Sequence, residues 1–92
     1  MIRELVGKKV VCEDLIVGVV TEIIFDLNNW KITHLEVELT REATDLCFGF
    51  RKGGIRNRLS VSAIGKVGKT IELKVKKGQL KYIYLKPQKT VA

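Results

Sequence analysis

The stretch FDLNNWKITHLEVEL (residues 25–39) decides the fold, because polar and apolar side chains alternate along its second half. From Thr33 to Leu39 the odd positions are mainly apolar, whereas the even positions carry a histidine and two glutamates. This period of two is typical of a β-strand with one buried face and one solvated face. Ahead of it, DLNNWK (residues 26–31) has the composition of a hairpin turn. The stretch therefore predicts the end of one strand, a tight turn and a second strand paired with the first.

The only tryptophan of the chain lies in this turn. Asn28 or Asn29 can take the left-handed backbone position, because asparagine tolerates positive φ better than most residues. Trp30 then needs no glycine-like conformation, and a turn offers few neighbours to bury it. We expect Trp30, with Asn29 and Lys31 beside it, to anchor a protein interface, since tryptophan is enriched among residues that dominate binding energy. The alternative is that the ring folds back over a neighbouring apolar side chain and caps the core.

Short stretches on both sides of this hairpin continue the strand pattern. Residues 16–27 are rich in β-branched side chains and apolar on both faces, which predicts a central strand with a bend or bulge at Gly18. Residues 40–47 are the only stretch that favours a helix, with Thr40 as its cap and Glu42 in its first turn. Further strands are expected at 8–13, 57–62, 70–76 and 80–85, with turns at 67–69 and 77–79.

The predicted elements limit the architecture. Short strands joined by tight turns leave no room for the crossover helices of a parallel sheet. We therefore predict an all-β fold, a small antiparallel barrel of about six strands with one short helix, formed by a single domain over residues 1–92. No apolar run approaches the roughly 18 residues that span a bilayer. We expect a cytoplasmic protein without direct membrane insertion.

Little in the sequence points to a cofactor or a reaction. Cys12 and Cys47 lie far apart without CxxC spacing, and the chain has one histidine, so we expect no metal site. Free thiols are the simpler interpretation, and a disulfide between them is the alternative. GKVGKT (residues 65–70) lacks the first glycine of a phosphate-binding loop and precedes a strand pattern. No acid, base and nucleophile can be named together, so we predict neither an enzyme nor a cofactor.

Charge divides the chain into two halves. Residues 1–50 hold five Lys and Arg against nine acids, a balance of −4, and residues 51–92 hold twelve against one, a balance of +11. Such a division permits a nucleic-acid surface, an acidic protein partner, or self-association of a basic face with an acidic one. A small core adds to the last possibility, so a homodimer is expected. The alternative is that lysines alternating with apolar residues are the wet side of strands.

Two basic segments carry the remaining candidate residues. FGFRKGGIRNR (residues 48–58) predicts an aromatic, positively charged loop that binds an acidic protein surface or phosphates, unless its phenylalanines close the end of the barrel. Its candidate interaction residues are Phe48, Phe50, Arg51, Lys52, Arg56 and Arg58. Tyrosines sharing one strand face, with lysines nearby, can stack nucleotides. The possible nucleic-acid contacts, which we expect to be weak and non-specific, are Lys74, Lys76, Lys81, Tyr82 and Tyr84.

Two longer stretches resemble a known family. ELVGKKVVCEDLIVGVVTEIIFDLNNWKITHLEVEL (residues 4–39) resembles the opening of PRC-barrel domains, and LSVSAIGKVGKTIELKV (residues 59–75) resembles their closing segment. The resemblance covers residues 4–76 and leaves 77–92 as an extra strand and tail. Relatives often have glycine at the position of Trp30, and many have a proline near Val61 that this chain lacks.

The resemblance implies a function in protein binding. Single-domain archaeal PRC-barrel proteins look most similar, and some are cell-division adaptors that bind a SepF-type anchor of the division ring. Other PRC barrels belong to a ribosome-maturation factor or to a photosynthetic reaction-centre subunit. We therefore expect a non-enzymatic protein-protein interaction module, an archaeal cell-division adaptor with a SepF-type anchor or another PRC-barrel protein as its partner. The alternative is an RNA- or ribosome-associated factor that uses the basic C-terminal half.

Overall fold

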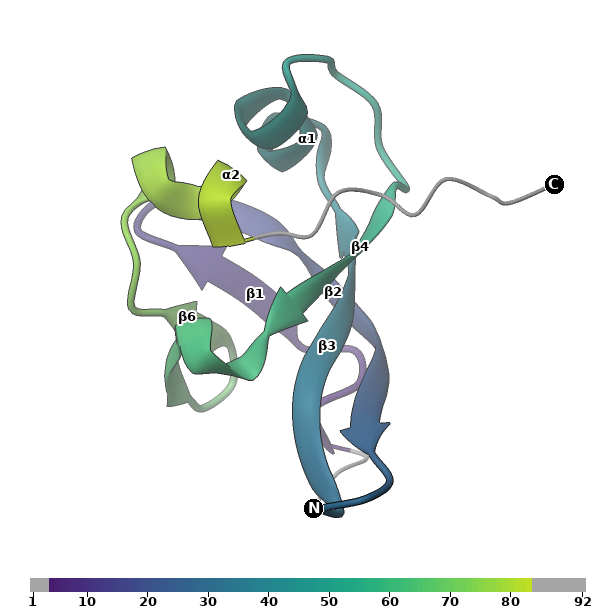
Figure 1. Ribbon diagram of the computed structural model, residues 1–92. Helices are drawn as coiled ribbons and strands as arrows, with labels where there is room; N and C mark the ends of the chain where they lie inside the picture. Colours follow the sequence, from purple (N-terminus) through teal and green to yellow (C-terminus); the bar gives the residue numbers. More distant parts are fainter. Residues whose placement is uncertain (1–3, 84–92) are drawn as a thin grey trace, which may run out of the picture.

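The computed structural model describes residues 4–83, whose strands form one curved sheet with short helices at one end (Figure 1). The strands are β1 (Lys9–Cys12), β2 (Leu15–Asp26), β3 (Lys31–Leu39), β4 (Arg56–Ser60), β5 (Ile64–Val67) and β6 (Ile71–Leu73). The helices are α1 (Arg41–Phe48), α2 (Leu80–Ile83) and the single 3-10 turns η2 (Val61–Ala63) and η3 (Lys77–Gln79).

The six strands lie in the order β4-β3-β2-β1-β6-β5. All neighbours are antiparallel except β1 and β6, which run parallel with Val10 opposite Ile71. The prediction of an all-β fold with about six strands is confirmed, but the prediction of a purely antiparallel sheet is wrong. Within residues 4–83 the sheet is also not closed by hydrogen bonds, because β4 and β5 form its two edges and do not pair.

The connection between the two edge strands explains why β6 pairs parallel to β1 and why the sheet stays open. Only η2 separates the end of β4 from the start of β5. Since three residues reach about 10 Å at most, the sheet must curl until its edges nearly meet. The turn η2 thus bridges the gap that a sixth pairing, between β4 and β5, would fill in a closed barrel. It also brings the chain to the β1 side of the sheet, where β6 pairs parallel to β1.

The long hairpin of β2 and β3 forms the centre of the sheet, as the alternation predicted. Its register runs from Gly18 opposite Leu39 to Asp26 opposite Lys31. Where β1 meets β2, the register shifts so that Val10 opposes Gly18 and Val11 opposes Ile16, which leaves one extra residue on β2. This irregularity is the predicted bulge at Gly18.

The helix α1 begins after its predicted cap, Thr40, and ends at Phe48, one residue beyond the predicted end. The Thr40 hydroxyl accepts the backbone N–H of Ala43 at 3.2 Å and donates to the carbonyl of Ile16 at 2.7 Å, so it caps the helix and ties it to β2. Gly49 ends the helix with φ +81°. The buried face of α1, Ala43 and Thr44, lies over the end of the core.

The C-terminal part departs most from the predictions. The strand expected at 57–62 ends at Ser60, β5 was not predicted, and β6 is shorter than the expected 70–76. Over residues 80–83 the expected strand 80–85 is wrong, because these residues form α2; residues 84 and 85 lie outside the described part of the chain. Leu80 is fully buried whereas Lys81 and Tyr82 are exposed, so a helical turn places one anchor in the core.

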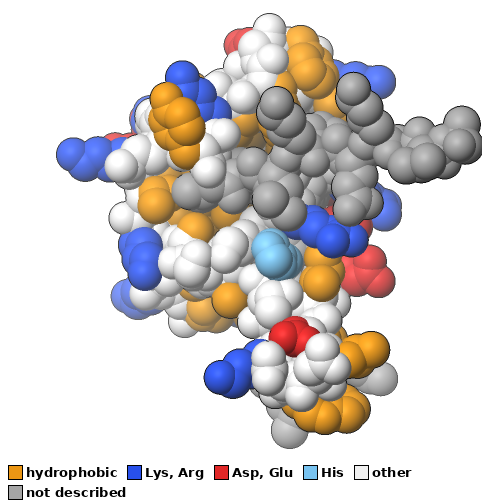
Figure 2. All heavy atoms as spheres, viewed as in Figure 1, with side chains coloured by type: hydrophobic (Ala, Val, Ile, Leu, Met, Phe, Trp, Pro, Cys, Tyr) orange, Lys and Arg blue, Asp and Glu red, His pale blue; other side chains and the backbone are white. Residues whose placement is uncertain are grey.

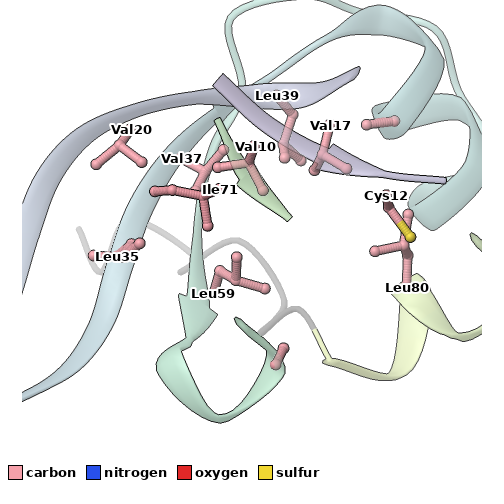
Figure 3. Packing of buried hydrophobic residues seen from close by; sticks show 12 residues of the cluster. Val10, Cys12, Val17, Val20, Leu35, Val37, Leu39, Leu59, Ile71 and Leu80 are labelled. Atoms are coloured by element: carbon pink, nitrogen blue, oxygen red, sulfur yellow. The ribbon is translucent and has the colours of Figure 1, made fainter. Parts of the chain in front are cut away.

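Contacts with the β1–β2 turn hold the segment before α2. The Lys77 ammonium lies 2.6 Å from an oxygen of Asp14, and the Glu13 carboxylate accepts the backbone N–H of Lys77 at 2.7 Å. The hydrogen bond and charge of Lys77 lower the pKa of Asp14, and Asp14 in turn raises the pKa of Lys77. This connection places Leu80 beside Cys12 in the core (Figure 3).

The core fills the concave side of the curled sheet (Figure 3). Alternate residues of the central strands point inward, which is the burial that the period of two predicted. The fully or nearly buried apolar side chains are Val10, Cys12, Val17, Val20, Leu35, Val37, Leu39, Ala43, Leu59, Ala63, Ile71 and Leu80.

Candidate protein-binding surface

The turn between β2 and β3 is held by one aspartate. Asp26 accepts the backbone N–H of Asn28 at 2.9 Å through one carboxylate oxygen and the side-chain amide of Asn29 at 2.8 Å through the other. Asp26 also pairs with Lys31 across the base of the turn. The expected site residue Asn29 is therefore a brace of the turn, and Lys31 is an exposed residue at its edge.

Trp30 itself adopts the left-handed conformation of this turn. Its φ is +54°, so the expectation that Asn28 or Asn29 takes this position is wrong. Among the described residues, Glu13 is the only other non-glycine residue with positive φ. The Asp26 contacts fix the two asparagines in the body of the turn, which leaves the residue before β3 to make the reversal. A tryptophan thus stands where glycine is usual for steric reasons.

The side chain of Trp30 is 80% exposed, so the alternative in which the ring caps the core is wrong. Leu27, on the same turn, is 74% exposed, and Phe25 at the end of β2 is partly exposed. Hydrophobic side chains gather at the free end of the hairpin, away from α1 (Figure 2). We call Phe25, Leu27 and Trp30 the hairpin tip. Leu27 and Phe25 were not among the predicted site residues, although apolar residues beside a polar turn were the available signal.

The second expected site, residues 48–58, is divided by the fold. Phe48 packs against the core, whereas Phe50 is 47% exposed and stacks on Phe48 with ring centroids 6.2 Å apart. Phe48 therefore closes the core, and Phe50 extends the aromatic surface beyond it. Lys52 is exposed in the loop between α1 and β4.

The arginines of this segment face acidic residues of the same chain. Arg51 lies 3.5 Å from Glu42 and 3.7 Å from Asp45 of α1. Arg56 of β4 lies 3.7 Å from carboxylate oxygens of both Glu36 and Glu38 on β3. Arg58 is opposite Glu36 in the register of the same two strands. Arg51, Arg56 and Arg58 of the basic half of the sequence therefore lie beside carboxylates of its acidic half.

The expected nucleic-acid contacts do not form one strand face. Lys74 and Lys76 are exposed on the segment that leads to α2. Lys81 and Tyr82 are neighbours on α2, with the ammonium 5.1 Å from the ring centroid, and Tyr82 is 76% exposed. Tyr84 lies outside the described residues. The predicted ladder of tyrosines on a strand is wrong as far as residue 83, because the segment is helical there.

The two cysteines are free thiols. Cys12 is buried and its sulfur lies 3.1 Å from the carbonyl oxygen of Val75. Burial raises the pKa of Cys12, and burial together with the nearby Cys12 raises the pKa of Cys47 to about 11. Across residues 4–83 no group of three or more His, Cys, Asp or Glu side chains is placed to hold a metal ion.

The curled six-stranded sheet, its short capping helices and its exposed hairpin tip define a small β-domain of the barrel type. The chain belongs to the PRC-barrel domain family, whose profile matches residues 1–80. The match confirms the resemblance and extends it past residue 76 to the start of α2. Comparison with curated proteins finds no match. None of the helices within residues 4–83 has the length and apolar character needed to cross a membrane.

Proposed function

We propose that the protein is a non-enzymatic protein-protein interaction module that binds its partner through the hairpin tip. The observation that carries the proposal is the conformation of Trp30, which combines φ of +54° with 80% exposure. A left-handed conformation is about 1–2 kcal/mol unfavourable for a residue with a side chain. Because the indole is exposed, packing within residues 4–83 does not offset this conformational cost. A contact with another molecule would explain why a tryptophan occupies this position.

The geometry of the tip fits an apolar pocket on a partner. Asp26 fixes the turn through two hydrogen bonds, so little backbone freedom is lost on binding. Trp30 and Leu27 provide a rigid aromatic and a branched aliphatic side chain, the kind of anchor that dominates interface energies. Asp26 and Lys31 flank these side chains with opposite charges. A partner surface with little net charge around the pocket therefore fits the tip better than a strongly charged one.

The finer proposal is a cytoplasmic adaptor of archaeal cell division whose partner is a SepF-type anchor of the division ring. Membership of the PRC-barrel family and the resemblance of the segment around Trp30 to single-domain archaeal members support it. The alternative, an RNA- or ribosome-associated factor, has less support, because Arg51 and Arg56 already face carboxylates of the same chain.

The test compares two exposed aromatic residues in different places. Trp30→Ala removes the tip anchor, and Tyr82→Ala removes an equally exposed ring on α2. Binding to a purified SepF-type anchor is measured by calorimetry, and the folding stability of each variant by urea denaturation. We expect Trp30→Ala to weaken binding by about tenfold or more, with stability unchanged, and Tyr82→Ala to change neither.

Other outcomes separate the alternatives. A loss of about 3 kcal/mol or more in stability, with binding unchanged, would assign Trp30 to the core. If the SepF-type anchor does not bind, affinity purification from the native cell with and without nuclease distinguishes another protein partner from nucleic acid. Loss of all captured partners after nuclease treatment would contradict the interaction module and favour the RNA-associated alternative.

A further inference from the structure

The convex face of the sheet carries apolar side chains at its centre. On β2, Ile16 is 46% exposed and Val19 is 37% exposed, and both point away from the core that Val17 and Val20 fill. Val11 of β1 pairs with Ile16 and is half-buried on the same face. Residues 16–27 are apolar on both faces of the strand, so apolar side chains remain on the face that does not contact the core. Ile16 and Val19 are therefore accessible on this face of the described part of the chain.

Charged residues flank this stripe in an ordered way. In the register of the sheet, Val19 pairs with Lys9 on β1 and with Glu38 on β3. One strand further out, Glu38 pairs with Arg56 on β4. On the other side, Glu72 of β6 is in register with Val11, two residues along β1 from Lys9. From β6 to β4, the side chains on successive strands are therefore negative (Glu72), positive (Lys9), apolar (Val19), negative (Glu38) and positive (Arg56).

This pattern is antisymmetric about β2. Lys9 and Glu38 lie one strand from β2 on opposite sides and carry opposite charges, and so do Glu72 and Arg56 at two strands. Consider a second copy that faces the first and is related to it by a two-fold axis parallel to β2. In this arrangement β2 of one copy lies over β2 of the other, and β1 of one copy lies over β3 of the other. Lys9 of one copy then lies over Glu38 of the other, and Val19 lies over Val19. Isologous interfaces need this kind of self-complementarity.

We propose that the convex sheet face around Ile16 and Val19 binds a second copy of this chain, with Lys9 of each copy paired to Glu38 of the other. The existing contact of Glu38 with Arg56 leaves room for this pairing, since it is a single contact at 3.7 Å between exposed side chains. A partner with an acidic or a basic surface fits the face less well, because both signs alternate across it. The proposal does not depend on the hairpin tip, whose Trp30 lies at the far end of β2 and stays free.

Charge reversal at the two positions tests the pairing. In Lys9→Glu and in Glu38→Lys, each dimer gains two like-charge contacts in place of two attractive ones, so we expect about a tenfold or larger rise in the dimer dissociation constant for each. The double variant Lys9→Glu/Glu38→Lys restores both pairs with reversed signs and should dimerise like the original protein. Lys81→Glu is the matched control, because it changes the net charge as Lys9→Glu does, at an exposed position on α2 and not on the sheet.

Sedimentation equilibrium gives the mass and the dissociation constant of each variant, and circular dichroism melting confirms that each is folded. The expected result for the original protein is a dimer of twice 10.4 kDa. A monomer up to about 100 μM, far above the range of specific dimers, would overturn the proposal. So would a double variant that dimerises no better than the single variants, or an equal loss of dimerisation in Lys81→Glu. Binding by Trp30 to its partner is measured separately, so failure here leaves the hairpin-tip proposal standing.

Discussion

Gly18 of β2 lies so close to β3 that a Cβ atom at this position would be 2.2 Å from the carbonyl oxygen of Glu38. The same atom would be 2.7 Å from a methyl group of Val37, a core residue. Both neighbours belong to the strand that β2 pairs with, so they cannot withdraw without opening the sheet. The bulge at Gly18 and the close approach of β3 are therefore one feature, which glycine alone permits.

Gly18→Ala should destabilise the protein by about 2–3 kcal/mol, as expected for overpacking against a rigid backbone. Gly68→Ala is the control, because a Cβ there would meet no atom within 4 Å and the residue does not have positive φ. Urea denaturation of the two variants checks the difference. Equal stabilities would show that β2 and β3 can separate locally to admit a methyl group.

The free energy of unfolding of Trp30→Gly should equal that of Trp30→Ala or exceed it by up to about 1 kcal/mol. Glycine adopts positive φ without steric strain, but its greater freedom in the unfolded chain offsets part of this gain. Thermal or urea denaturation of both variants measures the difference. A glycine variant clearly less stable than the alanine variant would show that residue 30 does not hold the left-handed conformation in solution. Partner binding should be lost equally in both, because each lacks the indole.

The thiol of Cys47 should make stability depend on alkaline pH. Burial and the nearby Cys12 raise its pKa to about 11 from the ordinary value of 9.0. Between these values the unfolded chain has lost this proton and the folded chain has kept it, so stability falls as pH rises from about 9 to about 11 and is unaffected by this group below that window. Denaturation at about pH 8 and about pH 10.5 should therefore show a larger loss in the original protein than in Cys47→Ala. Equal losses would contradict the burial of this thiol.

Binding to random RNA should be weak and should collapse between about 50 and 200 mM salt, as complexes dominated by phosphate contacts do. The exposed lysines Lys74, Lys76 and Lys81 provide charge without a surface that reads bases. Fluorescence anisotropy across this salt range measures the effect, with Tyr82→Ala expected to change the affinity by less than about threefold, below the usual effect of losing a base-stacking ring. Sequence-selective binding that survives the higher salt would favour the RNA-associated alternative over the interaction module.

The sequence by itself determined the central hairpin, the start of the helix α1 and the family. The alternation in residues 25–39 predicted the β2–β3 hairpin, and Thr40 predicted the start of α1, because strand burial and helix capping depend on residues close in sequence. The two stretches that resemble PRC-barrel domains lie within the residues that the family profile matches. For the candidate site, the sequence placed Trp30 in a turn with few neighbours to bury it, but left open whether the ring caps the core.

Only the tertiary structure decided how distant segments meet. The parallel pairing of β1 with β6 depends on how far the sheet curls before η2 crosses from one edge to the other, and the residues of either strand do not encode that curvature. The repeat of Leu80, Tyr82 and Tyr84 has the period of a strand, yet one buried leucine against the core was enough to favour a helical turn at Leu80–Ile83. Arginines of the basic half lie beside glutamates of the acidic half because β4 pairs with β3. Asp26 holds both asparagines through contacts that span only two and three residues, yet which of the turn residues takes the left-handed backbone, Trp30 and not an asparagine, was seen only in the folded hairpin.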